Sequence, residues 1–547
     1  MNTTRTISNF NLSESFSWFP PFYERALDLG AMLRKKYGNV HLCDDTQKLK
    51  DGDIYILNSG ENFSTIELLN LAREKRPIAL IADTKEKKVI EDWCTKNIKS
   101  NEKGWKKIYF VRSMKTLSGF LASSFYLNPS NRISISAVTG TNGKTTVVNA
   151  AAKAFAEAEG ACASLGTLGL IIYEKALNNV KENQILEFGM TTPSAVSLQR
   201  YLNYIVNQGI NRLILEASSI GLVQGRLLSC KIKHAVLTNI GHDHLDFHGS
   251  FNELQAAKVL LFTAPDLDKV IFVKSNKTSF TTLKTIEKKI AKKLNSFLVS
   301  AANNKIKSDV SLKIDSVCGN GTEVSFEYKS KLIDRFLIPT IGTHNIENAA
   351  VVAGLLSIEA VNIKKIVSAL KKFKPPTGRM SFYKDKNCPL VCVDYAHTPD
   401  AFEKTLSTLK SLIYKKKGKL LCVFGCGGDR DTSKRPLMGK IAASYCDGGY
   451  ITSDNPRSEN ISIINEQILG GINKNSRSKW AQFENRSIAI TQAILKANID
   501  DVVLIAGKGH ENYQIIKTKR IFFDDVIEVQ SAFKIRNKNM EVIRNET

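Results

Sequence analysis

The sequence has no run of about 18 or more apolar residues, so it offers no candidate for a membrane-spanning helix. The first 22 residues lack the basic start and apolar stretch of a secretory signal. Internal repeats and low-complexity tracts are also missing. With 43% hydrophobic and 24% charged residues, the chain has the composition of a soluble globular protein. We therefore expect a cytoplasmic protein, and its length of 547 residues predicts about three to four domains.

The cysteines give no sign of a disulfide framework. Among the ten, Cys388 and Cys392 have a Cys-x3-Cys spacing, as do Cys422 and Cys426. Both pairs lie on or beside apolar, strand-like runs, where such side chains fill a core. We therefore favour reduced, structural thiols over a zinc knuckle.

Acidic residues are fewer than basic ones, 53 against 77, so the net charge is +24. The lysines occur in small groups with little aromatic interleaving, which is typical of solvated faces. This pattern argues against nucleic-acid binding as the main function. A diffuse positive field would instead attract an anionic nucleotide substrate.

Three segments divide the chain. Residues 1–128 have a mixed pattern, whereas strands alternate with helical stretches in residues 129–374. A linker with proline and glycine follows at 374–378, and residues 375–547 contain further strands that end in polar or Gly-rich turns. This alternation predicts an α/β protein of three domains, with a central P-loop-type, mostly parallel sheet and a Rossmann-like C-terminal domain. The expected strands cover residues 53–57, 77–82, 133–138, 212–216, 234–239, 390–395, 419–424, 449–453 and 502–506.

A glycine-rich loop joins the strand at 133–138 to a helical stretch at 145–158. Glycines let backbone amides approach phosphate oxygens, and the N-terminus of a helix adds positive potential. Lys144 can neutralise phosphate charge, and the Thr145 hydroxyl can ligate magnesium. The loop therefore predicts binding of a nucleoside triphosphate. Its candidate phosphate-binding residues are Gly140, Thr141, Asn142, Gly143, Lys144, Thr145 and Thr146.

Two polar clusters fall at the ends of successive expected strands. Glu216 ends one strand, and His242, Asp243 and His244 follow the next. A carboxylate and an imidazole at adjacent strand ends, near a triphosphate, predict magnesium ligands or residues that orient them. The alternative is zinc held by His242, His244 and His248, because imidazole favours zinc. For His248 alone, a structural role is favoured.

Taken in order along the chain, these motifs resemble those of Mur ligases, which form amide bonds at the expense of ATP. The resemblance runs from about residue 130 to 515 and is strongest for the ligases that add the third residue of the peptidoglycan stem peptide. It implies an enzyme that adds meso-diaminopimelate to UDP-N-acetylmuramoyl-L-Ala-D-Glu through an acyl phosphate and uses ATP and Mg²⁺. It also implies a monomer whose partners are small molecules. The motifs that carry it are 139–146, 191–193, 216–226, 238–249, 256–258, 342–348, 378–380, 394–399, 424–435 and 454–457.

The resemblance also implies roles for individual residues. Magnesium would be bound by Thr145, Glu216, His244 and a carbamylated Lys258. The catalytic set would be Lys144, Lys258, His244 and Arg379. The remainder of the ATP site would comprise Asn345, Asn348, Arg379, Asp394 and His397. The muramoyl dipeptide would contact Thr46, Thr191, Thr192, Ser218 and Arg226. The diaminopimelate pocket would comprise Arg430, Asp454, Asn455, Arg457, Gly507 and Glu511.

Several positions depart from the family pattern. Ile220 stands where the family usually has a histidine, and Ser381 where an acid usually follows Gly-Arg-Met. In the uridine-binding region, residues 45–48 replace the usual Asp-Ser-Arg, so Thr46 keeps a hydroxyl but the arginine is gone. Two alternatives therefore stay open: a Mur-like or folylpolyglutamate-type ligase with another substrate, and a non-catalytic nucleotide-binding protein.

Overall fold

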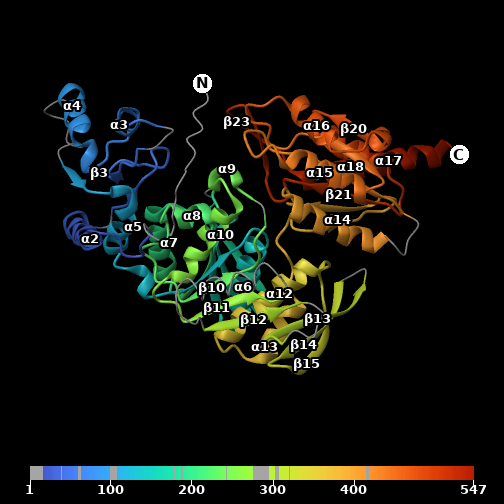
Figure 1. The fold of residues 1–547 in the computed structure, drawn as a ribbon, viewed down its shortest axis with the longest axis horizontal. Coiled ribbons are helices and arrows are strands. Elements are labelled where there is room, and N and C mark those ends of the chain that lie inside the picture. Colours follow the sequence, from blue (N-terminus) through green and yellow to red (C-terminus); the bar gives the residue numbers. More distant parts are fainter. Residues whose placement is uncertain are drawn as a thin grey trace.

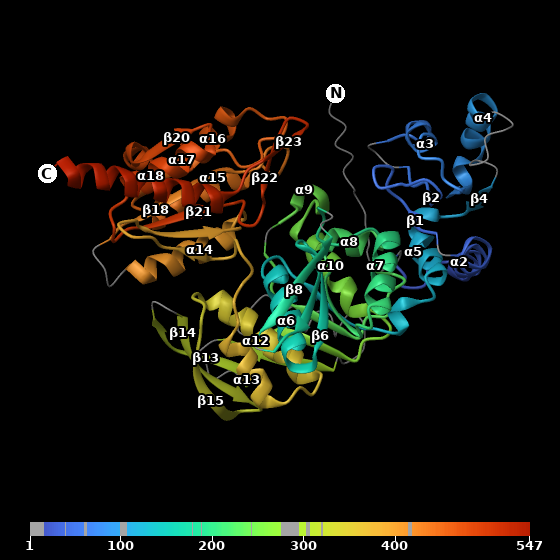
Figure 2. The ribbon, with the colours of Figure 1, turned by 180° about the vertical axis from the view of Figure 1, so that it is seen from behind.

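The computed structural model describes residues 16–38, 40–59, 63–98, 107–177, 179–186, 189–241, 243–274, 295–301, 307–318, 321–413 and 418–546. Three sheets, each with its helices, follow one another along the chain (Figure 1). The N-terminal part, in blue, and the C-terminal part, in orange to red, lie on either side above the central part. The reverse view shows the same arrangement (Figure 2). Helix α9 (Leu245–His248) rises from the central part between the other two.

The N-terminal sheet is small and parallel, in the order β1-β2-β3-β4. Its strands are apolar on both faces because helices α2 and α5 pack on one side and α3 and α4 on the other. The strands are β1 (Leu42–Cys43), β2 (Ile54–Ile56), β3 (Ala79–Asp83) and β4 (Ile108–Val111). The helices are α2 (Tyr23–Tyr37), α3 (Thr65–Arg73), α4 (Lys87–Asn97) and α5 (Met114–Phe125).

The central sheet has eleven strands in the order β15-β14-β13-β12-β11-β10-β5-β9-β6-β7-β8. The run from β13 to β6 is parallel, and antiparallel hairpins extend both edges. In β9, Leu213 and Leu215 face the core with α7, whereas Ile214 packs with α6 and α12. Because both faces are covered, polar side chains are left at the strand ends.

The elements of the central part have the following bounds. The strands are β5 (Ser134–Thr139), β6 (Ala161–Gly166), β7 (Gly169–Lys175), β8 (Val180–Leu186), β9 (Arg212–Glu216), β10 (His234–Leu237), β11 (Lys269–Val273), β12 (Ser296–Ser300), β13 (Val310–Cys318), β14 (Gly321–Tyr328) and β15 (Lys331–Ile338). The helices are α6 (Lys144–Glu159), α7 (Ala195–Asn207), α8 (Ser219–Val223), α9, α10 (Phe251–Val259), α12 (Thr343–Ile358) and α13 (Ile363–Lys371).

The C-terminal sheet has the order β16-β17-β21-β18-β19-β20 and is parallel except for β16. Its strands are β16 (Ser381–Tyr383), β17 (Leu390–Asp394), β18 (Leu420–Phe424), β19 (Gly448–Thr452), β20 (Trp480–Phe483) and β21 (Val502–Ala506), with a separate hairpin of β22 (Tyr513–Ile516) and β23 (Lys519–Phe522). The helices are α14 (Pro399–Ile413), α15 (Lys434–Tyr445), α16 (Ile461–Gly470), α17 (Arg486–Lys496) and α18 (Asp525–Glu546).

The α/β class, the mostly parallel central sheet and the three-domain architecture are confirmed. Two expected strands, 212–216 and 502–506, have the predicted bounds. The antiparallel strands β13 to β15 and the hairpin β22–β23 were not foreseen. The Cys-x3-Cys thiols are free and buried in the core, as predicted. The exact domain boundaries, the cytoplasmic location and the monomeric state stay predictions.

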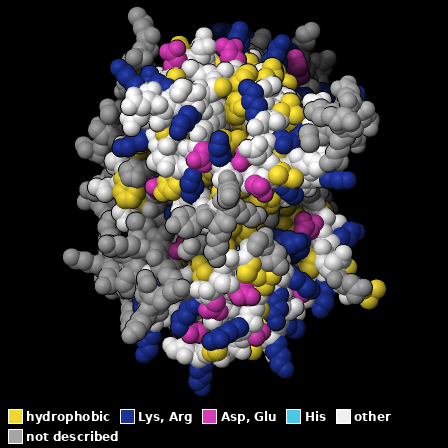
Figure 3. All heavy atoms as spheres, turned by 90° about the vertical axis from the view of Figure 1, so that its right-hand side faces the viewer, with side chains coloured by type: hydrophobic (Ala, Val, Ile, Leu, Met, Phe, Trp, Pro, Cys, Tyr) yellow, Lys and Arg dark blue, Asp and Glu magenta, His cyan; other side chains and the backbone are white. Residues whose placement is uncertain are grey.

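Two further observations concern the surface and the helices. Lys and Arg side chains are spread over the face shown in Figure 3, with Asp and Glu between them. Within the part of the chain that the structure describes, none of the helices is long and apolar enough to cross a membrane.

Candidate active site

The glycine-rich loop lies between β5 and α6, where the backbone turns sharply. Gly140 and Gly143 both have positive φ, at 147° and 86°, in the region that favours glycine. A Cβ on Gly140 would stand 2.0 Å from Thr238 Oγ1, and one on Gly143 would stand 2.4 Å from Asn348 Oδ1. The loop is therefore pressed between β10 and α12, and the start of α6 borders a pocket where an anion can meet backbone amides.

Two lysines, the half-buried Lys144 and the buried Lys258, converge on the carbonyl of Gly140. Lys144 Nζ donates to Gly140 O at 2.7 Å and to Thr141 O at 2.9 Å, and Lys258 Nζ donates to Gly140 O at 3.2 Å. Burial lowers the pKa of both, and the charge of Lys144 helps bring the pKa of Lys258 to about 7. A large fraction of Lys258 is therefore an unprotonated amine at neutral pH.

Glu216 lies fully buried at the end of β9, beside the loop. Its Oε2 accepts hydrogen bonds from the hydroxyls of Thr145 and Thr167, each at 3.2 Å, and its Oε1 accepts from Thr167 N at 2.9 Å. Burial raises the pKa of Glu216, and the charge of Lys144 opposes that shift. Arg379 Nη2 reaches the Thr145 hydroxyl at 3.4 Å. A carboxylate, a hydroxyl and a guanidinium thus meet at the start of α6.

The segment after β10 brings His244 to the same region. His244 has a left-handed backbone (φ 50°), and its Nε2 lies 3.5 Å from Asp243 Oδ2. His248 is buried, and its Nε2 lies 2.9 Å from Ser219 Oγ, which agrees with the structural role favoured for it. His242 lies outside the described residues. Among those that are described, no three His, Cys, Asp or Glu side chains are grouped to hold a metal. The zinc alternative requires His242 and therefore stays untested.

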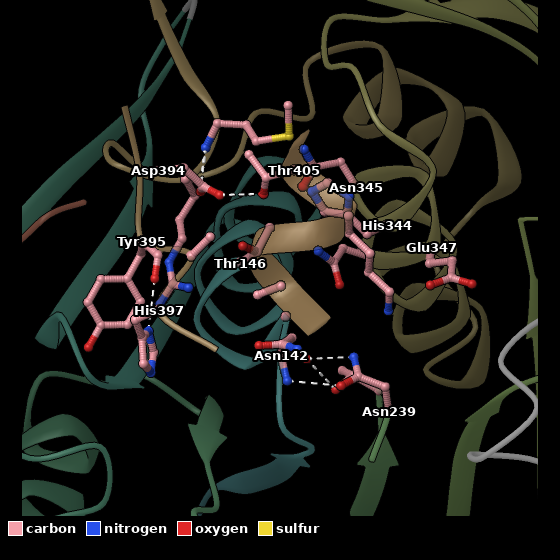
Figure 4. A pocket seen from close by; sticks show the side chains of 18 of the residues that line it. Asn142, Thr146, Asn239, His344, Asn345, Glu347, Asp394, Tyr395, His397 and Thr405 are labelled. Carbon is pink, nitrogen blue, oxygen red and sulfur yellow. Dashed lines mark hydrogen bonds between the residues drawn. The ribbon is translucent and has the colours of Figure 1, made fainter. Parts of the chain in front are cut away.

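A pocket lies between the central and C-terminal domains, and most of the residues predicted for ATP line it, whereas Gly140, Thr141, Lys144 and Thr145 do not. The close view shows the Asn142 side of the loop, the start of α12 and the segment after β17 converging on it (Figure 4). The predicted residues that line it are Asn142, Gly143, Thr146, Asn345, Asn348, Arg379, Asp394 and His397. Burial lowers the pKa of His397 to about 4, so its ring is neutral at physiological pH.

Asp394 joins the linker to the C-terminal domain. Its Oδ1 accepts from Met380 N at 2.9 Å, and its Oδ2 accepts from Thr405 Oγ1 at 2.7 Å (Figure 4). The guanidinium of Arg379, next to Met380, lies over the ring of Tyr395 at 4.2 Å from its centre. Asp394 and Tyr395 therefore hold Arg379 where it reaches the phosphate-binding loop.

A second, larger cavity of about 1000 Å³ collects the residues predicted for diaminopimelate. They come from the loops after β18, β19 and β21. All of them line the cavity: Arg430, Asp454, Asn455, Arg457, Gly507 and Glu511. The same cavity is lined by His244 and Thr191 of the central domain and by Gln47 of the N-terminal domain. These six residues, which we call the amine pocket, therefore face the same space as His244, the histidine predicted to bind magnesium.

Hydrogen bonds fix the charged groups of the amine pocket. Asn455 Nδ2 donates to Glu511 Oε2 at 2.9 Å, and Lys508 Nζ donates to the same oxygen at 3.1 Å. Arg457 Nη1 donates to Gly428 O at 2.8 Å. Burial raises the pKa of Glu511, and the charge of Asp454 adds to that shift. The six predicted residues thus bring two guanidinium groups and two carboxylates to the cavity.

Sequence reasoning missed some residues of this cavity. Lys508 is fully buried beneath it, and its place inside Gly-Lys-Gly-His-Glu was a signal that could have found it. Arg520 and Tyr513 also line the cavity, and the Arg520 guanidinium stacks on the Tyr513 ring at 3.7 Å from its centre. Both belong to the unforeseen hairpin β22–β23. Asp243, quoted in a motif but given no separate role, lines the cavity beside His244.

The residues predicted for the muramoyl dipeptide divide into two groups. Thr191 lines the large cavity, whereas Thr192 is buried and donates to Glu216 O at 2.8 Å. Thr192 Oγ1 also accepts from Ser218 N at 3.0 Å, and Arg226 donates to Thr192 O. The three residues Thr192, Ser218 and Arg226 thus form one network behind Glu216, and their contact with substrate stays a prediction.

Thr46 follows β1 in the N-terminal domain and is half-buried. Its neighbours Asp45, Gln47 and Lys48 line the large cavity. Close by, Ser194 Oγ donates to Asp44 Oδ1 at 3.0 Å and joins the central domain to this loop. The loop is therefore placed at the cavity, while the role of Thr46 stays a prediction.

Comparison with known proteins identifies the family. The chain matches the model described as Mur ligase middle domain over residues 138–356, and the model described as Mur ligase, glutamate ligase domain, over residues 378–509. The chain belongs to the Mur ligase family, and it is therefore an ATP-dependent enzyme that forms amide bonds. The non-catalytic alternative is wrong.

Individual relatives narrow the comparison. A UDP-N-acetylmuramoyl-L-alanyl-D-glutamate–2,6-diaminopimelate ligase of Buchnera aphidicola is 34% identical over 513 residues, which cover 90% of this chain and 94% of that protein. The ligase of the same name from Haemophilus ducreyi is 34% identical over 510 residues, covering 91% and 96%.

Solved structures agree with this placement. A structure of a ligase of the same name is 30% identical, with a TM-score of 0.56, and covers 91% of this chain and 95% of its own. MurF ligase from Thermotoga maritima in complex with ADP has a TM-score of 0.61 at 16% identity, covering 94% and 99%, and shows the shared fold alone.

Proposed function

We propose that the chain joins meso-2,6-diaminopimelate to UDP-N-acetylmuramoyl-L-alanyl-D-glutamate and converts ATP to ADP and phosphate, as a step in peptidoglycan precursor synthesis. One observation carries the proposal: Arg430, Arg457 and Glu511 line the same cavity as His244. His244 lies close enough to Lys144, at the phosphate-binding loop, for the two charges to interact. The relatives that match most of the chain bear the name of this activity.

The residues around the loop fit ATP and magnesium. Backbone amides at the start of α6 and the ammonium of Lys144 suit phosphate oxygens. Arg379 Nε is buried without a hydrogen-bond partner within the described part of the chain, as expected for a donor that meets a ligand. The Thr145 hydroxyl and Glu216 carboxylate are oxygen donors of the kind that magnesium prefers. When bound, the metal supplies positive charge that shields the phosphate oxygens from the attacking carboxylate.

Lys258 suits carbamylation, the modification proposed for it. Its Nζ is buried, and burial brings its pKa to about 7, so the free amine is available. Attack of this amine on CO₂ would form an N–C bond and release a proton, which leaves a carbamate of charge −1. That group would replace a buried cation near Lys144 with an anion able to ligate magnesium together with Glu216 and His244.

The proposed reaction has two steps. A carboxylate oxygen of the D-glutamyl residue attacks the γ-phosphorus, and the bond to ADP breaks, which gives an acyl phosphate. The amine of diaminopimelate then attacks the acyl carbon, loses a proton, and phosphate leaves. Lys144 and Arg379 would hold the charge of the transferring phosphoryl group, so that positioning and electrostatics carry most of the catalysis.

The amine pocket supports the choice of diaminopimelate over lysine. The planar guanidinium of Arg457 can form two parallel hydrogen bonds with the distal carboxylate, a group that lysine lacks. Asp454 and Glu511, in the same cavity, are suited to the distal ammonium. Lysine would leave the guanidinium without its partner.

Phosphate release tests the proposal directly. Purified protein is incubated with ATP, Mg²⁺ and the nucleotide dipeptide, and diaminopimelate, lysine or glutamate is added in parallel. We expect release that requires both the dipeptide and diaminopimelate, with Lys144→Ala providing the background rate. Equal release with lysine or glutamate, or release without the dipeptide, would show that the substrate assignment is wrong.

A further inference from the structure

Buried cations of the C-terminal domain gather behind the amine pocket. Arg435, Arg486 and Lys508 are among its largest fully buried side chains. Arg435 Nη2 donates to Gly427 O at 3.1 Å, and Lys508 Nζ donates to Asn455 Oδ1 at 3.3 Å. Gly427 and Asn455 both line the cavity. Arg435 and Lys508 thus each bind a residue that lines the pocket, from the side away from the cavity. Arg486 binds two loops of the pocket at once.

Arg486 is the first residue of α17, and Asp525 is the first residue of α18. Arg486 Nε donates to Asp525 Oδ1 at 2.7 Å and Nη2 donates to Asp525 Oδ2 at 2.9 Å, with both side chains fully buried. Nη2 also donates to Ala506 O at 2.9 Å, and Nη1 donates to Ser453 O at 3.3 Å. A single guanidinium, fixed by one carboxylate, therefore joins the carboxyl ends of β21 and β19.

The residue after each of these carbonyls belongs to the amine pocket. Gly507 follows Ala506, and Asp454 follows Ser453. Gly507 has a positive φ of 114°, and a Cβ there would stand 2.6 Å from Asp454 Oδ2. The two loops are in such close contact that a small change in their spacing would move the Asp454 carboxylate.

Stability alone gives no reason for this pair. Burying two charges costs desolvation energy, and apolar replacements of such pairs are often neutral or stabilising. Arg486 also places a cation in the first turn of a helix, where the dipole disfavours it. What a guanidinium offers here is geometry, because its planar fork can bind a carboxylate and two carbonyls in fixed directions.

We propose that Arg486, held by Asp525, is a positioning residue of the amine pocket. It sets the spacing of the loops after β19 and β21, and through them the affinity for the incoming amino acid, without touching that substrate. The proposal rests on the proposed function to the extent that the cavity receives an amino acid.

The test is a comparison of Arg486→Lys with a matched variant, Arg536→Lys. Arg536 lies on α18 and donates to Asn387 O at 2.8 Å and to Ala497 O at 2.7 Å, near the amino ends of β17 and β21. It therefore holds carbonyls at the opposite edge of the same sheet. We expect Arg486→Lys to raise KM for diaminopimelate at least about tenfold, as misplacement of a binding group does, with KM for ATP and the nucleotide dipeptide unchanged. Arg536→Lys should leave all three KM values unchanged, even where it lowers Tm.

A second variant covers the case in which Arg486→Lys does not fold. Asp525→Asn keeps an oxygen for Arg486 Nε but removes the charge, and we expect a smaller rise in the same KM. An unchanged amino-acid KM in a folded variant, equal rises in all three KM values, or the same rise in Arg536→Lys would overturn the proposal. If the wild-type enzyme prefers another amino acid, the assignment of diaminopimelate fails, and KM for that amino acid still decides the role of Arg486.

Discussion

The phosphate-binding site and the amine pocket both lie at the carboxyl ends of parallel strands, yet they hold buried charge in opposite ways. In the central domain, Lys144 and Lys258 donate to main-chain carbonyls, and Glu216 accepts from two hydroxyls and an amide. In the C-terminal domain, buried cations have carboxylate partners. These pairs are Arg435–Glu459, Arg486–Asp525 and Lys508–Glu511.

This difference indicates where the buried charges need a ligand to balance them and where they do not. Lys144 and Glu216 attract each other, but the hydrogen bonds that each makes are to neutral groups. A buried charge in such surroundings costs free energy, and an anion or a metal ion relieves that cost on binding. A buried pair is complete before any ligand arrives, so it can hold a pocket in shape. We infer that the charges of the central site lower the stability of the protein but serve ligand binding. The buried ion pairs behind the amine pocket instead keep that pocket rigid.

The largest effect is expected from Lys258→Ala, which should lower kcat by a factor on the order of 10³, because it removes the proposed metal ligand. A short carboxylic acid added to the assay should restore part of the activity by supplying the missing carboxylate. Phosphate release measures both. Lys153→Ala is the control, since Lys153 is half-exposed and pairs with Glu182. Full activity of Lys258→Ala without any supplement would remove Lys258 from the site.

Breaking the buried pair should have the next largest effect. Asp525→Ala leaves the Arg486 guanidinium buried and unpaired, which should lower the free energy of unfolding by about 3–5 kcal/mol. Urea denaturation measures this loss. Glu182→Ala, which breaks the exposed pair with Lys153, should cost less than about 1 kcal/mol. Similar losses in the two variants would show that the buried pair is no more important for stability than the exposed pair.

Arg457→Ala should act on one substrate. Loss of a charged hydrogen-bond donor to the distal carboxylate should raise KM for diaminopimelate by about 10- to 100-fold, or roughly 1.5–3 kcal/mol. KM for ATP serves as the internal control and should change less than about twofold, because Arg457 lies in the amine pocket and not at the loop. Equal rises for both substrates would remove Arg457 from the amino-acid site.

The smallest effect concerns stability at the central site. Lys258→Met should raise the free energy of unfolding by about 1 kcal/mol near pH 7 in CO₂-free buffer, because it removes a buried amine. Burial holds the pKa of Lys258 near 7 against an ordinary value of 10.5, so between these pH values the unfolded chain binds one more proton than the folded protein. Wild-type stability then rises with pH, and the advantage of the variant should shrink toward pH 10.5. An advantage that grew with pH would contradict the burial of the free amine.

Much of the fold followed from local pattern. The glycines at 140 and 143 and the strand before them predicted the loop, and apolar runs with polar ends predicted β9 and β21 with their bounds. These features depend on neighbours in sequence, which the pattern of residues displays directly. The strands β13 to β15 lack that clarity, since charged residues such as Asp334 and Arg335 interrupt the apolar pattern of β15.

The contacts that bury Lys258 and that pair Arg486 with Asp525 could not be predicted from local pattern. Lys258 lies on α10 like an ordinary helical lysine, and its burial against Gly140 joins positions 118 residues apart. Arg486 and Asp525 likewise meet only because α17 and α18 pack together. The resemblance to Mur ligases pointed to Lys258 but not to Arg486, because a residue that acts from behind a pocket carries no motif of its own.

The large cavity has a consequence for inhibition. One space of about 1000 Å³ is bordered by all three domains, from Gln47 through His244 to Arg457. The pocket beside the phosphate-binding loop shares Tyr395 and His397 with this space. A single molecule with a phosphate mimic in that pocket and an amino-dicarboxylate arm in the large cavity would therefore occupy both halves of the reaction at once. Once one end is bound, the effective concentration of the other is set by the linker, so the affinities reinforce each other. A substitution that weakens one end would leave the contacts at the other in place.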